Sequence, residues 1–477
     1  MTSVLLEREP LVHVPDQAEE ARGRLLSLYG RLLPILLGGY FLFDKAFAYI
    51  HLPGTPIYVG EMVLVVGALG ALAATGYLRI PIRDEPILAL LAAFFLWGFI
   101  RFIPGFGANG ISAVRDFALC YYCFFAFFTA AALAQRPGLV ERWMTQLARF
   151  VPWLLLWLPF AIILQSKALG ANVPFSGVSV FTHKPGNAAI AALVALGSLW
   201  LFPGTRSARS RALWSCLALV VMALSATQNR GGLVGASAGA LVGLALIPAR
   251  DRLRLIVRAV AAVAIGLILA LQLSLKIPTQ GRSFSASQLV ANVLSIGGAS
   301  SSAAGGLSGT VAGRDQLWSS IFEKEVAEGK LVDGFGFGVN LPYLVGDYQV
   351  TSGADPLRSP HNSHLDVLAR LGLIGAGLWI ALWVGWYRRM LLGCRRLAQR
   401  GLHARRQVAV LCTMTVTATL VSSFFDPQLE GAQIAAILWS AFGLGVAVTS
   451  FREWFGWLGP APPPPPPPPD ADLQGSG

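Results

Sequence analysis

Runs of apolar residues, each about 20 residues long, recur from one end of the chain to the other. An α-helix needs a run of about that length to cross the hydrocarbon core of a bilayer. Only 13% of the 477 residues are charged and 55% are hydrophobic, whereas a soluble domain carries about 25% charged residues. The sequence therefore predicts an all-α polytopic membrane protein.

We expect about twelve membrane-spanning helices, joined by short connections and by one long polar loop. A polar segment, 1–31, precedes the first nine spans, which occupy 32–276. The long loop covers 277–361, the last three spans lie within 362–450, and a proline-rich tail covers 451–477. The expected spans are 32–50, 57–77, 86–104, 112–134, 144–165, 186–202, 212–228, 231–247, 254–274, 362–387, 407–425 and 431–450.

Arginines follow every second expected span. Arg79 and Arg83 follow the second span, Arg250 and Arg252 follow the eighth, and seven arginines lie in 388–406 after the tenth. Because Lys and Arg collect in cytoplasmic loops, this alternation predicts that both termini lie in the cytoplasm. The long loop then faces outward, which is the periplasm in a Gram-negative cell. The same rule accounts for the net charge of +12, so we expect no nucleic-acid partner.

The long loop and the start of the next span hold side chains suited to chemistry. The segment 313–329 (GRDQLWSSIFEKEVAEG) predicts a short amphipathic helix, and 333–340 (DGFGFGVN) predicts a turn. His361 follows, where the loop meets the membrane. A lone histidine there can simply cap a helix or bond a carbonyl group. We favour a catalytic or substrate-binding role because His361 shares the loop with Arg314.

Three cations are expected on this outer face. Arg230 lies in TQNRGG (227–232), Lys184 lies in FTHKPGN (181–187), and Arg314 opens the expected loop helix. Arginine grips phosphate oxygens bidentately and stays charged at any working pH, so these cations suit a lipid-linked diphosphate. The outside lacks nucleotide sugars, so a sugar donor there must arrive already activated on a lipid carrier. The sequence does not by itself bring these groups together in space.

One motif starts at His361-Asn362 and ends, after nine residues, at Gly372-Leu-Ile-Gly375. On an uninterrupted helix, His361, Gly372 and Gly375 fall near one face. The two glycines on that face would leave room for a lipid chain or for a closely packed neighbouring helix.

At these residues the chain resembles the O-antigen ligase and polymerase family of bacterial surface-polysaccharide enzymes. The resemblance extends over roughly 181–451, and the His-Asn…Gly-x-x-Gly pattern matches the ligase signature in full. The family's arginine signature is usually Arg, three residues, Leu. Here Trp318 stands at the leucine position after Arg314, which leaves the choice between ligase and polymerase open.

The resemblance implies a C-type glycosyltransferase fold in the bacterial inner membrane, with a periplasmic active site. It implies an undecaprenyl-diphosphate-linked glycan as donor, an inverting transfer, and neither a metal nor another cofactor. His361 would be the general base, Arg230 and Arg314 would bind the diphosphate, and Asn362 would orient the loop or the glycan. Lys184, Gly372 and Gly375 are expected to support the site.

Several functions remain open at this point. The first is an O-antigen ligase that moves a glycan onto lipid A–core, and the second is a polymerase that joins lipid-linked repeat units of an O-antigen or exopolysaccharide. A protein O-oligosaccharyltransferase would use the same donor. A transporter would predict charged residues in the membrane midplane and a repeat between the two halves, and the sequence has no clear internal repeat. Membrane lipids are expected partners of each.

Overall fold

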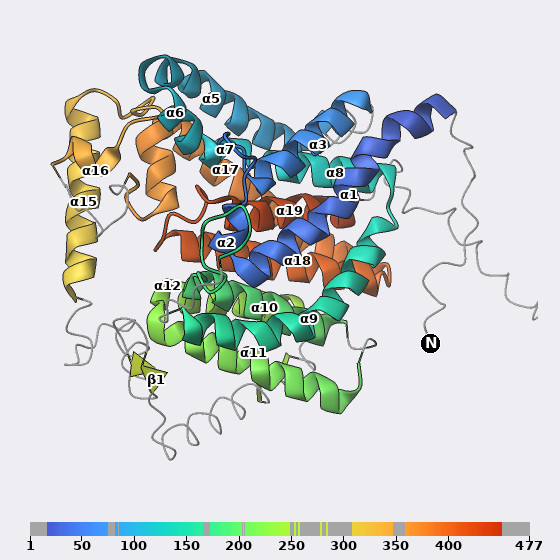
Figure 1. The fold of residues 1–477 in the computed structure, drawn as a ribbon. Helices are drawn as coiled ribbons and strands as arrows, with labels where there is room; N and C mark the ends of the chain where they lie inside the picture. The colour runs from blue at the N-terminus through green and yellow to red at the C-terminus, as the bar shows by residue number, and fades with distance from the viewer. Residues whose placement is uncertain are drawn as a thin grey trace, which may run out of the picture.

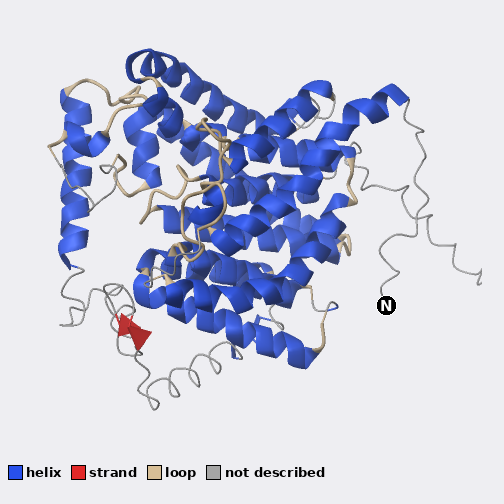
Figure 2. Ribbon diagram, in the orientation of Figure 1, coloured by secondary structure: helices blue, strands red, loops and turns tan. Residues whose placement is uncertain are grey.

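The computed structural model is almost entirely helical (Figure 2), apart from one pair of two-residue antiparallel strands, β1 (Ile277–Pro278) and β2 (Ser283–Phe284). It describes residues 17–74, 82–83, 85–165, 172–202, 204, 206–248, 252–253, 256–257, 277–278, 283–284, 308–346 and 358–450. The helices are α1 (Gln17–Phe43), α2 (Lys45–Ala48), α3 (Val59–Ala73), α5 (Pro86–Asn109), α6 (Ile111–Asp116), α7 (Ala118–Tyr121), α8 (Phe124–Gln135), α9 (Leu139–Leu164), α10 (Pro185–Leu201), α11 (Ala208–Gln228), α12 (Arg230–Leu246), α15 (Ser308–Ala327), α16 (Leu341–Leu344), α17 (Ser363–Gln399), α18 (His403–Ser423) and α19 (Ala432–Thr449).

Among the described residues, six helices are long and apolar enough to cross a membrane: α1 from Gly23 onward, α5, α9, α11, α17 and α19. The helices over 111–121 and 124–135 meet at 45° and add a seventh span if they count as one. Three more apolar helices, α3, α10 and α12, are shorter. The expected multi-pass helical architecture is thus confirmed, but the count of twelve spans is not. The expected span 254–274, apart from 256–257, and the tail 451–477 lie outside the described residues.

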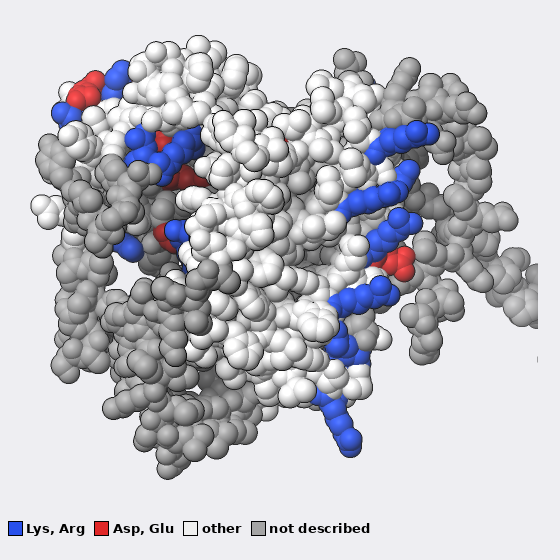
Figure 3. Space-filling view, in the orientation of Figure 1, with Lys and Arg blue, Asp and Glu red and all other residues white. Residues whose placement is uncertain are grey.

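Most of the helices run side by side, and α15 stands across one end of this bundle (Figure 1). Lys and Arg side chains line the opposite end, where α1 begins (Figure 3). A smaller group of charged side chains of both signs lies at the α15 end. This separation agrees with the expected topology, in which the basic end is cytoplasmic. The orientation itself stays a prediction.

Helix α19 forms the centre of the bundle, with 89% of its span buried. Its Trp439 and Phe442 stack on Trp383 and Trp386 of α17, each pair with ring centroids 5.6 Å apart. Elsewhere small residues let backbones approach closely, as they do in many membrane helix pairs. A Cβ atom at Gly235 of α12 would lie 2.5 Å from a carbonyl oxygen of α18. Aromatic and small-residue packing therefore hold the bundle together.

Helix α17 is broken at Gly372, whose φ of 66° and ψ of −167° are not helical. His361 lies before the helix starts, with a φ of 56°. The expectation that His361, Gly372 and Gly375 share one helical face is therefore wrong, because periodicity cannot register a break caused by tertiary contacts.

The loop over 331–336 repairs this break. A carbonyl or amide that loses its helical partner inside a bilayer costs several kcal/mol unless another group bonds to it. Backbone groups of the loop pair with the freed groups on both sides of Gly372, and an indole adds one more donor. The bonds are Phe335 N to Ala369 O (2.8 Å), Gly336 N to Arg370 O (3.0 Å), Leu373 N to Leu331 O (2.8 Å) and Trp97 Nε1 to Leu371 O (2.9 Å).

Glycines permit this close contact. A Cβ atom at Gly372 would lie 2.2 Å from Val332 O, and one at Gly334, where φ is 75°, would lie 2.4 Å from the Arg370 carbonyl carbon. The space beside Gly372 is thus filled by loop backbone rather than by a lipid chain or a neighbouring helix. Gly375 faces the Leu371 side chain of its own helix.

We predict that Gly372→Ala destabilises the protein by about 2 kcal/mol or more, because it combines a strained φ with a backbone clash. The measurement is thermal unfolding of the purified protein in detergent. Gly377→Ala is the control, because Gly377 lies in the same helix with open space around its Cβ position. Equal melting temperatures for the two variants would contradict the bracing role of the loop.

Candidate active site

Three connections meet α15 at one end of the bundle. They carry Lys184 before α10, Asp426 after α18 and His361 before α17, and α15 itself carries Arg314. Lys184 Nζ lies 3.2 Å from Asp426 Oδ2, and the Ser363 hydroxyl donates to the Asp426 carbonyl oxygen at 3.4 Å. The site is therefore assembled from segments far apart in the chain.

His361 is half-buried at the centre of these charges. Burial lowers the pKa of its imidazole, and the positive charges of Arg314 and Lys184 lower it further. The nearby carboxylate of Asp426 acts in the opposite direction. The ring is consequently neutral at pH 7 and presents a nitrogen lone pair, which is the state that a general base requires.

Arg314 reaches this site because α15 docks against the loop before α17. The Trp318 indole donates to Pro360 O at 2.7 Å and packs edge-on against Phe424. Leu317 and Ile321 bury their side chains, as expected of an amphipathic helix, whereas Phe322 is exposed. Trp318 thus anchors α15 next to His361.

Arg230 begins α12, one residue after its cap Asn229, whose side chain accepts from Gly232 N at 2.8 Å. A Cβ atom at Gly232 would lie 2.5 Å from Gly186 Cα, so the Arg230 turn packs directly on the turn that follows Lys184. The structure therefore brings the backbone at Arg230 to the same end of the bundle as the other predicted site residues.

Asp44 is a site residue that sequence reasoning missed. It is fully buried with a φ of 45°, and its carboxylate accepts from Lys184 N at 2.6 Å and from Asn187 Nδ2 at 2.9 Å. His183 Nδ1 lies 3.7 Å from the same carboxylate. Asp44 thereby fixes the backbone that carries Lys184. The sequence signal that could have identified Asp44 and Asp426 is an acidic residue at the end of an apolar run.

Asn362 and His364 are occupied by structural hydrogen bonds. Asn362 Oδ1 caps α17 by accepting from the backbone N–H groups of His364 (3.0 Å) and Leu365 (3.2 Å). The His364 Nε2–H group donates to Leu420 O at 2.9 Å, and Nδ1 accepts from the Trp379 indole at 3.0 Å. Asn362 can thus orient the loop because it caps the start of α17. Both ring nitrogens of His364 are already used in structural hydrogen bonds.

A buried charge network lies behind the His361 loop. Arg370 Nε donates to Asp366 Oδ1 at 3.0 Å, an ion pair between residues four positions apart on α17. Asp116 Oδ2 accepts from Arg370 at 2.9 Å, from Arg358 at 3.2 Å and from Gly338 N at 3.0 Å. The network ties α6, α17 and the glycine-rich segment together.

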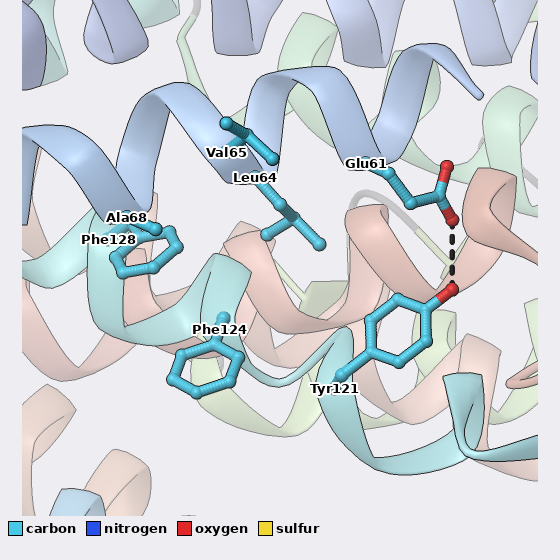
Figure 4. A pocket seen from close by; sticks show the side chains of 7 residues that line it. All are labelled: Glu61, Leu64, Val65, Ala68, Tyr121, Phe124 and Phe128. Carbon is cyan, nitrogen blue, oxygen red and sulfur yellow. Dashed lines mark hydrogen bonds between the residues drawn. The ribbon is translucent and has the colours of Figure 1, made fainter. Parts of the chain in front are cut away.

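A separate open pocket of about 290 Å³ lies between α3 and α8 (Figure 4). Its lining is aliphatic and aromatic except at one end, where the Tyr121 hydroxyl donates to Glu61 at 2.9 Å. Such a lining suits a hydrocarbon chain better than a sugar. The lining residues are Glu61, Leu64, Val65, Ala68, Tyr121, Phe124 and Phe128.

The described part of the chain contains no group of three or more His, Cys, Asp or Glu placed to hold a metal ion. The expectation of a metal-independent reaction stays a prediction.

These observations define the class of the protein: an integral membrane protein with a charged site at one end of its helix bundle. Residues 215–380 match the family model described as O-antigen ligase, and this match supports a relationship to the O-antigen ligase family. The match includes Arg230, Arg314 and His361 and ends before Asp426. It supports a ligase or polymerase type of function on a lipid-linked glycan in a membrane. No curated protein matches the chain.

Helix α15 also buries a carboxyl group at Glu325, one turn beyond Ile321. Glu325 is fully buried, and among the described residues neither of its carboxyl oxygens has a hydrogen-bond partner. Burial raises its pKa to about 7, and the charge of Asp333 adds to the shift. Since the folded-state pKa exceeds the ordinary value of 4.5, the carboxyl destabilises the fold as the pH rises from about 4.5 through about 7.

We predict that Glu325→Gln raises the melting temperature at pH 8 and changes it little at pH 5, since the amide cannot ionise. The measurement is thermal unfolding at both pH values, with Glu323→Gln as the control at an exposed position of the same helix. A stabilisation that is equal at both pH values would argue against ionisation of Glu325.

Proposed function

We propose that the chain is an O-antigen ligase that transfers a glycan from undecaprenyl diphosphate to lipid A–core at the periplasmic face of the inner membrane. The observation that carries this proposal is the neutral His361, which lies among Arg314, Lys184 and Asp426. His361 and Arg314 fall within the family match, and Lys184 and Asp426 lie outside it. The basic far end of the bundle supports an outward-facing site.

In this mechanism His361 accepts the proton of the acceptor hydroxyl as the oxygen attacks the anomeric carbon. The bond between that carbon and the phosphate oxygen breaks, with inversion at carbon, and undecaprenyl diphosphate leaves. Arg230, Arg314 and Lys184 stabilise the negative charge that grows on the leaving diphosphate. Asp426 stabilises the imidazolium that forms at His361, because the two charges are opposite and close.

A polymerase that joins lipid-linked repeat units uses the same donor chemistry and is the second candidate. The specific observation that favours it is Trp318 at the position where the family's ligase signature has leucine. Lipid A–core serves as acceptor only for a ligase, whereas a second lipid-linked repeat unit serves a polymerase. A pilin-like protein acceptor would indicate a protein O-oligosaccharyltransferase. The family match favours each of these enzymes over a transporter.

We predict that His361→Ala and Arg314→Ala each lower glycan transfer by about 100-fold or more while the protein still inserts and folds. The measurement is in vitro transfer from a defined undecaprenyl-diphosphate glycan to purified lipid A–core, with a second lipid-linked unit as the alternative acceptor. Lys324→Ala is the control, because Lys324 is a half-exposed cation on the same helix as Arg314 and pairs with Glu328. Near-normal transfer by His361→Ala would overturn the assignment of the base.

The pH profile gives an independent test. We predict that kcat/KM falls only below about pH 6.5, since the pKa of His361 lies below its ordinary value of 6.5. Asp426 raises that pKa, so Asp426→Asn should move the acidic limb to lower pH. Initial rates measured across the pH range give the pH at which the acidic limb begins. Asp315→Asn, at an exposed position, is the control. A limb that moves to higher pH would contradict this role for Asp426.

A further inference from the structure

Glu430 adds a third carboxyl to the buried network behind His361. It lies in the turn between α18 and α19, where its carboxyl group lies close enough to interact with Asp366 of α17 and with Ser359 of the His361 loop. Lys184 lies close enough to Glu430 for their charges to interact. Glu430 therefore stands between the network and the proposed active site.

The network carries more acids than bases. Three carboxyls, on Asp116, Asp366 and Glu430, face two guanidinium groups, on Arg358 and Arg370. If every group were ionised, one negative charge would stay buried without a counterion, at a cost of several kcal/mol. Lys184 does not remove this excess, because it is already paired with Asp426. One proton bound to a carboxyl would make the network neutral.

The hydrogen bonds indicate which carboxyls hold that proton. Asp366 is fully buried and uses Oδ1 to accept from Arg370. Among the described residues, Asp366 Oδ2 and Glu430 Oε1 are both buried without a donor when both groups are treated as carboxylates. Two acceptors in contact repel each other, whereas a proton between them supplies the missing donor.

We propose that Asp366 and Glu430 share one proton, and that this carboxyl pair makes Glu430 a positioning residue for the loop that presents His361. The contact between Glu430 and Ser359 joins the pair to the segment two residues before His361. The Ser363 hydroxyl accepts from Leu429 N at 3.3 Å, so the 424–431 turn holds the loop on both sides of His361. Burial and the neighbouring carboxylate both raise the pKa of Glu430, in agreement with a bound proton.

The positioning role rests on the proposed glycosyl transfer, whereas the shared proton does not. Glutamine at 430 keeps a neutral group that donates to Asp366 and accepts from Ser359. We therefore expect Glu430→Gln to transfer glycan within about threefold of wild type. Glu430→Leu, which has neither a donor nor an acceptor, should lose about tenfold or more in kcat with little change in the KM for the donor.

Infrared spectroscopy of the purified protein tests the proton without any substrate. Both spectra are taken in a Glu325→Gln background, because the Glu325 carboxyl has a pKa of about 7 and would add a band of its own. With Glu430 intact, the protein should show the C=O stretch of a protonated carboxyl, and Glu430→Gln should lose that band because Asp366 is then ionised beside Arg370. If the band survives in Glu430→Gln, or was absent from the start, the shared proton is refuted.

The kinetic comparison has its own contrary outcome. If Glu430→Gln loses as much activity as Glu430→Leu, Glu430 acts as an ionised partner of Arg370, and the proposed pair is wrong. If no variant or wild type transfers glycan, the proposed function fails, and the infrared result still decides the carboxyl pair.

Discussion

The pairing of loop backbone with the broken helix α17 is the interaction on which the rest of the structure depends. Carbonyl and amide groups at 369–374 lose their helical partners, and in an apolar surrounding they must find others. The segment 331–336 supplies most of these partners, and glycines at 334 and 372 allow the two backbones to touch. Because the same loop connects to α15, the repair of the helix also fixes where α15 can dock.

The position of α15 decides which charges meet. Trp318 joins α15 to Pro360, and this contact brings Arg314 near His361. From the other side, Asp44 holds the backbone at Lys184, whose ammonium group pairs with Asp426. A half-buried imidazole among two cations and one carboxylate stays neutral. When the ring gains a proton, the carboxylate stabilises the resulting imidazolium. That combination is the basis for assigning His361 the role of base.

Buried charge has a second use behind this site. Direct ion pairs join three separate segments through Asp116, Arg358, Arg370 and Asp366. Removal of one partner is costly because it leaves another charge buried without a counterion. Such a network holds its members in one arrangement more strictly than apolar packing alone does. The His361 loop is thus held by α15 on one side and by a charged cluster on the other.

The amino-acid sequence alone predicted the membrane-spanning helical class, the basic end of the bundle and the amphipathic helix that carries Leu317 and Ile321. These are properties of composition and short-range spacing, and hydrophobic burial makes them visible in one dimension. The break at Gly372, the roles of Asp44, Asp426 and Glu430, and the approach of Arg314 to His361 were decided by tertiary structure. Each depends on segments tens to hundreds of residues apart, and the energy that selects them, backbone satisfaction and charge pairing in a low dielectric, exists only once those segments have met.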